Sequence, residues 1–411
     1  MGERVGTDIF MPTDKKALRK TNLQYTIWRE GPISRGDLAR LVHLNLPTIS
    51  TLISELMAEQ EIVEEGFATS TGGRRPQLLD VNPEVGHVIG VSFVTRGISS
   101  AHSNLKGVIE NRQDFEFDPS LGRDQAIKRL KEAVRAQIES LTQRGGRRLL
   151  RQIGIGISGL VDKGEGISRE FPRFESWADV PLREILEKEF DVPVVIDNNV
   201  ATITLAELIF GDLRHHANAL YVHLGSGIGS GIVIDGKVYK GSRSYVGEFG
   251  HVTVAENGPV CYCGNYGCLE AVASEYALIQ QAESARREGV HSSIYGEKTS
   301  TGAVKSDAIF RAAENGDRLA TRLVEKACSL MGTGIAALIN LFGPEAIILG
   351  GPMAQAGDIM LTPLRRSVLT QSLDRIHPEL EIRVSGFGNN AGLMGAITLA
   401  LHNHYTAAGG A

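Results

Sequence analysis

VHLGSGIGSGIVIDGKVYK, residues 222–240, has the pattern of a strand, a glycine-rich turn, a second strand and a polar hairpin. An earlier stretch, VSFVTRGISSAHSNLKGVI at residues 91–109, repeats this order, and Lys106 and Lys237 take the same place in the two hairpins. After Pro83, short apolar strands alternate with helical segments, which is typical of an α/β fold. The repeat therefore predicts two lobes, each of which opens with the same hairpin.

The glycines of the second copy distinguish it from the first. Four of them follow one another along the turn: Gly225, Gly227, Gly229 and Gly231. Backbone N–H groups in such a turn can approach a phosphate closely, but a tight hairpin without a ligand uses the same glycines. The first copy has Val94, Arg96 and Ile98 at the places of the first three. Since a nucleoside triphosphate is clamped well only by two facing glycine hairpins, a single copy argues against a full nucleotide site.

Downstream of this hairpin lies a cysteine cluster, GHVTVAENGPVCYCGNYGCLEA, at residues 250–271. The chain has four cysteines and no export signal, so we expect a reducing compartment and no disulfide. One imidazole and three thiolates form a common ligand set for zinc: His251, Cys261, Cys263 and Cys268. Four protein ligands leave no open coordination position, so such a zinc would be structural rather than catalytic. The alternative is three free thiols that pack as small apolar side chains.

Two carboxylates stand beside the cluster. Glu248 precedes His251 by three residues, and Glu270 follows Cys268 by two. A folded metal loop would hold both carboxylates near one place. Carboxylates gathered in this way suit a neutral polyol, because each one accepts two hydroxyl hydrogen bonds. Ordinary surface charge is the alternative explanation for both.

The segment NLQYTIWREGPISRGDLARLVHLNLPTISTLISELMAEQEIVEE, residues 22–65, contains three short amphipathic helical patterns. Their apolar stripes are Leu23, Ile27 and Trp28; Leu38, Leu41 and Val42; and Ile49, Leu52, Ile53, Leu56 and Met57. Ser34 can cap the second helix, and Asn45 can cap the third, with Pro47 in its first turn. Two helices joined by so short a turn predict a helix-turn-helix. Residues 64–83 then read as strand, glycine turn and strand, which is a wing.

The predicted DNA contacts are Arg35 and Asn45, then Thr48, Ser50 and Thr51 at the start of the recognition helix, and Arg74 and Arg75 at the wing tip. The net charge is −5, but residues 15–40 hold seven Lys or Arg against two acidic residues. The acidic residues from Glu55 to Glu65 are expected at the far end of the recognition helix, away from DNA. A plain helical subdomain with solvated charges is the alternative.

Length and composition limit the class of protein. A chain of 411 residues, 42% hydrophobic and 22% charged, indicates a globular protein of two or three domains. The N-terminus lacks the apolar region of a secretory signal. The longest apolar stretch, residues 334–351, is broken by Asn340, Pro344 and Glu345, which predicts a buried helix, a turn and a core strand rather than a membrane span. We therefore expect a cytoplasmic protein.

The stretch VGEFGHVTVAENGPVCYCGNYGCLEAVAS, residues 246–274, resembles the signature of the ROK family (repressors, open reading frames and kinases). The family pattern G-E-x-G-H followed by C-x-C-G-x-x-G-C-x-E is present entire. IGIGISGLVD at 153–162, the hairpin at 225–241 and ILGGPMAQAG at 348–357 also resemble family stretches, in family order. With the winged helix, the resemblance covers nearly the whole chain. It is greatest to the repressor branch that includes the glucose, xylose and N-acetylglucosamine regulators.

The resemblance implies a two-lobed actin-like ATPase (ribonuclease H-like) fold with an N-terminal winged helix-turn-helix. The implied domains are residues 1–83 for DNA binding, 84–197 plus 385–411 for the first lobe, and 198–384 for the second lobe with the zinc site and an oligomerisation surface. The resemblance also implies Zn²⁺ on the histidine and three cysteines. It implies a sugar between the lobes at Asn198, Asn199, Glu248, His251 and Glu270, with one histidine ring nitrogen on the metal and the other on the sugar.

Two departures from the family pattern argue against a kinase. Family kinases carry Asn-Asp where this chain has Asn198 and Asn199, and an amide cannot take the proton of a sugar hydroxyl. The family's first phosphate motif, Asp-x-Gly-Gly-Thr, falls on Ser92, Phe93, Val94, Thr95 and Arg96. Without the acidic residue and the glycines, neither magnesium nor phosphate has an obvious partner. We therefore predict that the protein is not an enzyme.

These features together predict a sugar-responsive transcriptional repressor of carbohydrate uptake or metabolism genes. Its expected partners are operator DNA, a sugar or sugar-phosphate effector and further copies of the chain, in a homodimer or a dimer of dimers, with no membrane. Sugar binding would change the closure of the lobes and the separation of two DNA-binding heads. Two alternatives remain: an ATP-dependent ROK sugar kinase, and a repressor induced by a sugar-transport protein.

Overall fold

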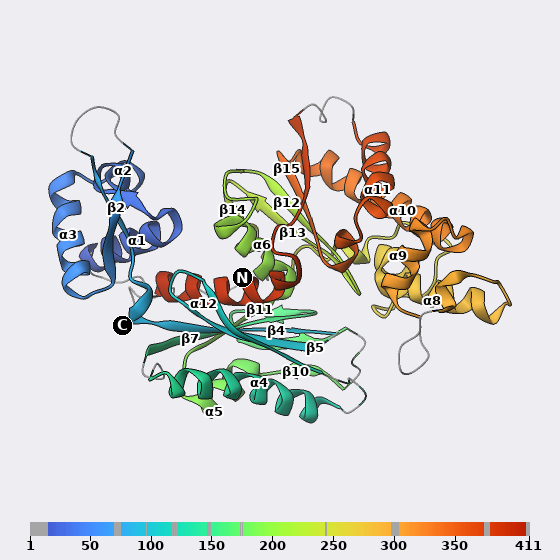
Figure 1. The fold of residues 1–411 in the computed structure, drawn as a ribbon, viewed down its shortest axis with the longest axis horizontal. Helices are drawn as coiled ribbons and strands as arrows, with labels where there is room; N and C mark the ends of the chain where they lie inside the picture. Colours follow the sequence, from blue (N-terminus) through green and yellow to red (C-terminus); the bar gives the residue numbers. More distant parts are fainter. Residues whose placement is uncertain are drawn as a thin grey trace, which may run out of the picture.

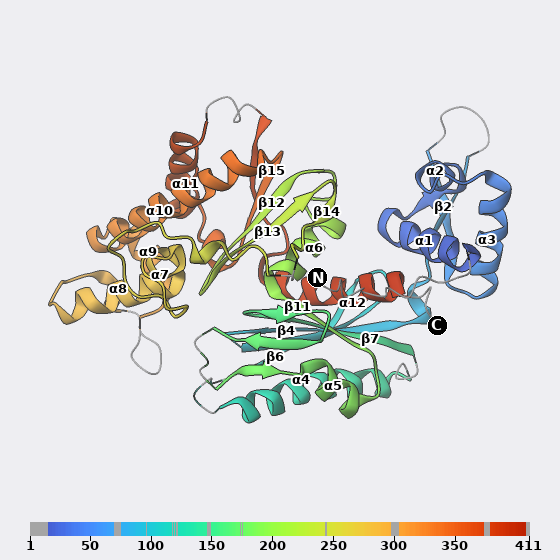
Figure 2. The ribbon, with the colours of Figure 1, turned by 180° about the vertical axis from the view of Figure 1, so that it is seen from behind.

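A computed structural model describes residues 15–69, 75–95, 97–116, 118, 120, 122–145, 149–172, 174, 176–242, 245–296, 304–373 and 379–407. These residues form an N-terminal head and two lobes, and each lobe is built on a five-stranded sheet (Figure 1). The head lies at one end of the molecule, next to the first lobe (Figures 1 and 2).

The described residues of the head form three helices and a small sheet of order β1-β3-β2. The elements are α1 (Lys15–Glu30), β1 (Ile33–Ser34), α2 (Arg35–Leu41), α3 (Leu46–Ala58), β2 (Ile62–Phe67) and β3 (Gln77–Val81). Both predicted caps are confirmed. Ser34 Oγ accepts a hydrogen bond from the Asp37 amide at 3.2 Å. Asn45 Oδ1 accepts one from the Thr48 amide at 2.9 Å, so the predicted winged helix-turn-helix is the observed fold.

One apolar position of the head is not buried as predicted. Leu38 is fully buried, but Leu41 is 54% exposed. Leu41 is the last residue of α2 and faces away from the core, whereas the next residue, Val42, is partly buried against it. A helical stripe predicts burial only as far as the helix continues.

The sheet of the first lobe has the order β11-β7-β4-β5-β6. Its strands are β4 (His87–Val94), β5 (Gly97–Asn104), β6 (Ile109–Phe115), β7 (Leu150–Ile157) and β11 (Val194–Asn198). Helices α4 (Arg123–Gln143) and α5 (Leu182–Phe190) cover one face, and α12 (Ala391–Ala407) covers the other (Figures 1 and 2). A 3₁₀ turn (Pro83–Val85) leads into this sheet, and a small sheet of β8 (Val161–Asp162), β9 (Ile167–Glu170) and β10 (Ala178–Val180) extends the lobe.

The sheet of the second lobe has the order β14-β13-β12-β15-β16. Its strands are β12 (Ala219–Leu224), β13 (Ile228–Ile234), β14 (Lys237–Val238), β15 (Ala346–Gly350) and β16 (Glu381–Val384). Its helices are α6 (Asn199–Phe210), α7 (Leu269–Ala273), α8 (Glu275–Arg287), α9 (Ser306–Glu314), α10 (Arg318–Phe342) and α11 (Asp358–Gln371), with 3₁₀ turns at Phe249–His251, Ser293–Gly296 and Pro352–Ala356. A further 3₁₀ turn, Gly388–Asn390, directly precedes α12. The predicted helix, turn and core strand of residues 334–351 are observed as the end of α10 and the fully buried β15. The prediction that this helix is buried is wrong for its last turn, where Leu341 is 76% exposed.

The two predicted hairpins open the two sheets. Strands β4 and β5 pair antiparallel from His87–Asn104 to Val94–Gly97, and β12 and β13 pair in the same way. In each lobe the first strand of the hairpin also pairs in parallel with a later strand, β7 or β15. The prediction of two lobes that share one opening motif is confirmed.

Helix α12 joins the head to the lobes. One apolar core contains Trp28 and Ile27 of α1 together with Leu401 and Tyr405 of α12. At the first lobe, the helix lies directly on the sheet because Gly90 has no side chain; a Cβ there would be 2.5 Å from Ile397 Cγ1. The head is therefore packed onto the body of the molecule through this helix.

Within the described residues, no helix combines the length and the apolar character that crossing a membrane requires.

Candidate functional site

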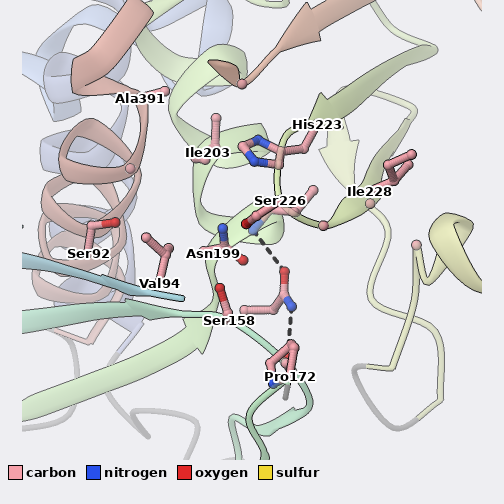
Figure 3. A pocket seen from close by; sticks show the side chains of 18 of the residues that line it. Ser92, Val94, Ser158, Pro172, Asn199, Ile203, His223, Ser226, Ile228 and Ala391 are labelled. Atoms are coloured by element: carbon pink, nitrogen blue, oxygen red, sulfur yellow. Dashed lines mark hydrogen bonds between the residues drawn. The ribbon is translucent and has the colours of Figure 1, made fainter. Parts of the chain in front are cut away.

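A cavity of about 240 Å³ lies between the two lobes. Residues from β4, β11, α6, β13, the metal loop and α12 all contribute to its wall. Figure 3 shows Ser92 and Val94 from the first lobe, Asn199 and Ile203 from α6, His223 and Ser226 from the second lobe and Ala391 from α12 around this space. All five residues predicted to bind a sugar line it: Asn198, Asn199, Glu248, His251 and Glu270.

Asn198 and Asn199 lie where β11 passes into α6. Asn198 Oδ1 accepts from the Val200 and Ala201 amides at 2.8 and 3.3 Å, and its Nδ2 donates to the Gly159 carbonyl at 2.8 Å. Asn198 therefore caps α6 and ties it to the first lobe. Asn199 is the first residue of α6, is 8% exposed and presents its amide near Ser158 (Figure 3). The polar group offered to the cavity at this point is an amide, which does not act as a proton acceptor in a transfer reaction.

Glu270 and Glu248 bring negative charge to the opposite wall. Glu270 is 4% exposed, and its Oε2 accepts a hydrogen bond from the Ile228 amide at 2.9 Å. The pKa of Glu248 is raised above its ordinary value, first by burial and then by the carboxylates of Glu270 and Glu170. The cavity is thus electronegative on this side.

The glycine turn of the second lobe is explained by close packing. A Cβ at Gly227 would lie 2.9 Å from Glu270 Oε2, and one at Gly229 would lie 3.1 Å from Val200 Cγ2. A Cβ at Gly231 would clash with Thr204 of α6. Close packing in a tight hairpin, the second explanation given for these glycines, is therefore sufficient to explain why side chains are absent here.

The hairpin turns of the two lobes touch each other. Thr95 Oγ1, in the position of the degraded phosphate motif, lies 2.9 Å from Ser226 Oγ in the glycine turn. Arg96, the last residue of that motif, lies outside the described residues. The space between the turns is therefore bridged by two hydroxyl groups.

The four predicted metal ligands lie together. The ligand atoms of His251, Cys261, Cys263 and Cys268 are all within 4.8 Å of one another. Cys263 Sγ lies 3.8 Å from Cys268 Sγ, and Cys261 Sγ lies 3.6 Å from His251 Nδ1. Tetrahedral bonds of about 2.3 Å to sulfur and about 2.0–2.1 Å to nitrogen would separate these atoms by about 3.8 Å and about 3.5–3.6 Å. The group therefore fits a tetrahedral metal ion.

The chemistry of the thiols agrees with such a site. Burial raises the pKa of Cys268 to about 12, and the neighbouring thiols add to this effect. Burial also raises the pKa of Cys261. Thiols in this setting stay protonated unless a cation stabilises their thiolates, so metal binding would release protons.

Tyr262 is a site residue that the sequence analysis missed. It lies between the first two cysteines, and its hydroxyl is 3.0 Å from His251 Nε2, while Glu248 Oε2 is 4.0 Å from the same nitrogen. The Nδ1 atom of His251 faces Cys261. The predicted division of this imidazole between a metal side and a cavity side is therefore consistent with its surroundings.

Further polar residues line the cavity without having been predicted: Ser158, His223, Ser226, Gln355 and Asn389. His223 and Ser226 belong to the hairpin that opens the second lobe, so the sequence offered a signal for these two residues. Burial lowers the pKa of His223 to about 4, so this ring is neutral at pH 7. Gln355 and Asn389 carry no sequence signal, because only the fold brings them to the cavity.

Four of the seven predicted DNA contacts are exposed on the head. Ser50 and Thr51 at the start of α3 are exposed, as are Asn45 and Arg75, while Thr48 is half-buried. Arg74 lies outside the described residues. Arg35 pairs with Glu64 at 2.9 Å, so this basic side chain is partly neutralised within the head. Lys16 and Lys20 likewise pair with Glu55 and Glu59 at 2.7 and 2.5 Å.

Comparison with known proteins separates two groups of relatives. The ROK family profile matches residues 89–403. A putative xylose repressor of Caldicellulosiruptor sp. is 33% identical over 390 residues, which are 94% of this chain and 96% of the relative. A solved ROK family transcriptional regulator, described as a homologue of the Escherichia coli MLC protein, has a TM-score of 0.80 at 27% identity and covers 95% of this chain and 97% of its own.

A glucokinase resembles only the lobes. The structure of the Streptomyces griseus ROK glucokinase in complex with glucose and AMPPNP has a TM-score of 0.68 at 28% identity, and the match covers 77% of this chain and all of the enzyme. The repressor relatives extend over the head as well, and the glucokinase does not. With a two-lobed actin-like fold, a winged helix and a matching family profile over most of its length, the chain belongs to the ROK family.

Proposed function

We propose that this protein is a cytoplasmic transcriptional repressor of carbohydrate genes that binds operator DNA through its head and a sugar in the interlobe cavity. One observation carries the proposal: α12 lines the cavity at its first turn and shares an apolar core with the head at its last turns. The full-length similarity to repressors, which includes the head, supports it.

Helix α12 transmits the effect of sugar binding from the cavity to the DNA-binding head. Its first residues, Ala391, Gly392 and Leu393, line the cavity. A Cβ at Gly392 would lie 3.0 Å from Ser92 Cβ, and one at Gly395 would lie 2.7 Å from Thr202 Oγ1 of α6. A helix packed this closely against both lobes moves when the lobes close, because dense packing transmits a displacement. The displaced helix then shifts the head.

DNA binding uses α3 as the recognition helix. Ser50 and Thr51 reach base edges or phosphates, and Arg75 contacts the backbone beside the wing. Two heads of a homodimer bind two half-sites about one helical turn apart, about 34–36 Å. A sugar that changes the separation of the heads therefore lowers the affinity for the operator.

Zinc has a structural role in this proposal. His251, Cys261, Cys263 and Cys268 would hold it, and four protein ligands leave no position for substrate. The metal would fix the segment between Glu248 and Glu270, which contains all four ligands. It would also fix the imidazole, so that Nε2 faces the cavity.

The protein lacks two groups that a sugar kinase of this family needs for phosphotransfer. Asn199 replaces the base, and Ser92 replaces the acidic residue of the first phosphate motif. The hydroxyl bridge from Thr95 to Ser226 occupies the place where the two turns would grip a triphosphate. We therefore propose that phosphotransfer is lost, also in an Asn199→Asp variant, because the base alone does not rebuild the phosphate site.

A coupled assay with ATP, Mg²⁺ and a panel of free hexoses and pentoses tests this part. The wild type and Asn199→Asp are both expected to stay far below about 1 s⁻¹, the low end of ordinary enzymes. Turnover at or above that rate in the wild type would favour the kinase alternative.

Operator binding is tested separately. DNA selected from genomic fragments by the full-length protein is labelled, and its affinity is measured by fluorescence anisotropy with and without each sugar. We expect nanomolar binding that at least one sugar weakens at least tenfold. An operator complex that no sugar changes would favour induction by a sugar-transport protein.

A further inference from the structure

Two basic side chains of the lobes, Lys106 and Arg214, form polar contacts with the head. Lys106 lies in the turn between β5 and β6 of the first lobe, and Arg214 lies between α6 and β12, at the edge of the second lobe. Lys106 contacts the strands of the wing, and Arg214 contacts the end of α1. The head is therefore bound to both lobes by charged groups, in addition to its apolar contact with α12.

Lys106 supplies the counter-ion of a buried carboxylate in the head. Its Nζ lies 2.9 Å from Asp80 Oδ2 of β3 and 2.5 Å from Glu65 Oε2 of β2. Asp80 is 7% exposed, and a Cβ at Gly31 would lie 2.7 Å from its Oδ1, so this carboxylate packs against the residue that follows α1. The turn that presents the lysine is held by Asn104, whose Oδ1 accepts from the Lys106 amide at 3.0 Å. Because a buried carboxylate is costly without its cation, this contact fixes the head to the first lobe.

Arg214 contacts the end of α1 from the second lobe. Its Nη2 donates to the Arg29 carbonyl at 2.9 Å and lies 3.5 Å from Glu30 Oε2. Both partners belong to the last turn of α1, where carbonyl groups lack acceptors' partners within the helix and attract cations. The Arg214 side chain is 34% exposed, whereas that of Asp80 is 10% exposed. The contact at Arg214 is therefore the more open to water of the two, and so the weaker one.

The chain around Arg214 is part of the second lobe. Its neighbour Leu213 is fully buried in one apolar core with Tyr221 of β12. Four residues after Arg214, the Asn218 amide donates to the carboxylate of Glu345, just before β15, at 3.1 Å. Arg214 is therefore expected to move with the sheet of the second lobe.

Strand β12 links the Arg214 segment to the interlobe cavity. It begins at Ala219, next to that segment, and ends at Leu224, next to the glycine turn that lines the cavity. Six residues of strand span about 20 Å. A rigid rotation of the second lobe therefore displaces Arg214 relative to Lys106, which stays with the first lobe. Because Asp80 packs against Gly31, the two cations hold neighbouring points of the head, and the head cannot follow both lobes.

We propose that Arg214 is a releasable contact between the second lobe and the DNA-binding head: the rotation of the lobes that follows sugar binding withdraws Arg214 from α1, while Lys106 keeps its place at Asp80. The head then turns about the Lys106 contact, and its recognition helix loses the orientation that fits the operator. Arg214 is the contact that breaks because it is the more exposed one, whereas Lys106 neutralises a buried carboxylate. The inference rests on the proposed function, since it names the contact through which the cavity releases DNA.

Arg214→Ala in the full-length, zinc-loaded protein tests the inference. Operator affinity is measured by fluorescence anisotropy with and without saturating glucose, xylose or N-acetylglucosamine, whichever titration shows to bind the wild type. We expect the sugar-free Kd for the operator to rise at least fivefold and the effect of the sugar on it to shrink at least fivefold. Sugar affinity should equal or exceed that of the wild type, because coupling is reciprocal and the lost contact opposed the rotation.

The control for charge is Arg366→Ala, which removes an exposed Arg from α11 of the second lobe and should behave like the wild type. Thermal midpoints show that both variants are folded. A folded Arg214→Ala with wild-type operator affinity and a wild-type sugar response would overturn the inference and leave the repressor proposal intact. A wild-type protein whose operator affinity none of the sugars changes would instead contradict the proposed function, and this inference with it.

Hydrogen exchange distinguishes release of the contact from a general loss of stability. Sugar should speed amide exchange at residues 27–31 of the wild type, where the Gly31 amide donates to the Ile27 carbonyl at 2.8 Å. Arg214→Ala should show this faster exchange without sugar, and peptides around Asp80 should exchange at the wild-type rate in both cases. Unchanged exchange at residues 27–31 on sugar binding would overturn the release of Arg214. Faster exchange around Asp80 would overturn the role of Lys106 as the contact that stays.

Discussion

The rings of Trp28 and Tyr405 stack with their centroids 5.1 Å apart and their planes inclined by 28°. Trp28 belongs to the head and Tyr405 to the last turns of α12, and both are nearly fully buried. Trp28 also meets Phe210 of α6 edge to face at 5.7 Å. The head is thus held by aromatic contacts to the two helices that form part of the cavity wall.

Tyr405→Ala should uncouple sugar binding from DNA binding. The change removes the stack and leaves a gap that costs about 3 kcal/mol of folding free energy. We expect sugar affinity within about threefold of the wild type, by titration, and at least a fivefold smaller effect of sugar on operator affinity. Tyr405→Phe is the control, because it keeps the ring and loses only a hydroxyl bond of 3.4 Å to the Leu105 carbonyl. If folded Tyr405→Ala responds to sugar like the wild type, α12 does not carry the signal through this contact.

Cys263→Ser should abolish zinc binding and the sugar response. The segment between Glu248 and Glu270 then loses its support, whereas the head is packed elsewhere, on α6 and α12. We expect no zinc by mass spectrometry, at least tenfold weaker sugar binding, and operator affinity close to that of the wild type. Cys328→Ser is the matched control, since Cys328 is buried in α10 and is not part of the metal group. A zinc-free Cys263→Ser that still responds to sugar would show that the metal does not position the site.

Arg75→Ala should weaken operator binding in a salt-dependent way. Arg75 is exposed just before β3, in the predicted wing. If its side chain contacts a DNA phosphate, binding releases about one counterion. The slope of log K against log salt should fall by about one unit, with little change in sequence preference. Arg123→Ala, on the first lobe, removes an exposed charge far from the head and should leave the slope as it is. Equal slopes for wild type and Arg75→Ala would remove this residue from the DNA surface.

The folded protein should become less stable in acid because two buried histidines of α12 resist protonation. Burial lowers the pKa of His402 and of His404 to about 4, with smaller contributions from Lys163, Lys240 and Arg29 for the first and Arg151 for the second. Between the unfolded pKa of about 6.5 and the folded value, the unfolded chain binds more protons, so stability falls as pH falls through this window. Each ring adds up to about 1.4 kcal/mol per pH unit.

Denaturant unfolding at pH 7, 6 and 5 checks this dependence. A His402→Gln, His404→Gln double variant should lose less stability than the wild type over the same range. His223 remains in both proteins and sets a common background. Equal losses in the two proteins would mean that these rings do not resist protonation.

The sequence predicts those parts of the molecule whose residues act locally. Ser34 and Asn45 cap their helices as expected, because a cap depends on three or four neighbouring residues. The grouping of His251 with the three cysteines was predictable because these residues lie within 18 positions and leave few other arrangements. The two hairpins were predictable because one motif occurs twice.

Other features depend on contacts between distant segments. The glycines of the second hairpin suggest a phosphate loop, and only the fold shows that Glu270 and Val200 occupy the space they leave. The pairing of Arg35 with Glu64 spans 29 positions of sequence, so no local pattern indicates that this predicted DNA contact is partly neutralised within the head. Leu41 was expected in the core because an apolar stripe does not show where its helix ends. Tyr262 and Asn389 reach the cavity through tertiary packing that no local pattern records.

The most direct test of the account is the operator affinity of the full-length wild-type protein, measured by fluorescence anisotropy in the presence and absence of a saturating free sugar that titration has shown to bind. The account predicts nanomolar binding without the sugar and a Kd at least tenfold higher with it. A sugar that binds the protein and leaves the operator affinity unchanged would contradict the central claim that the cavity regulates the head.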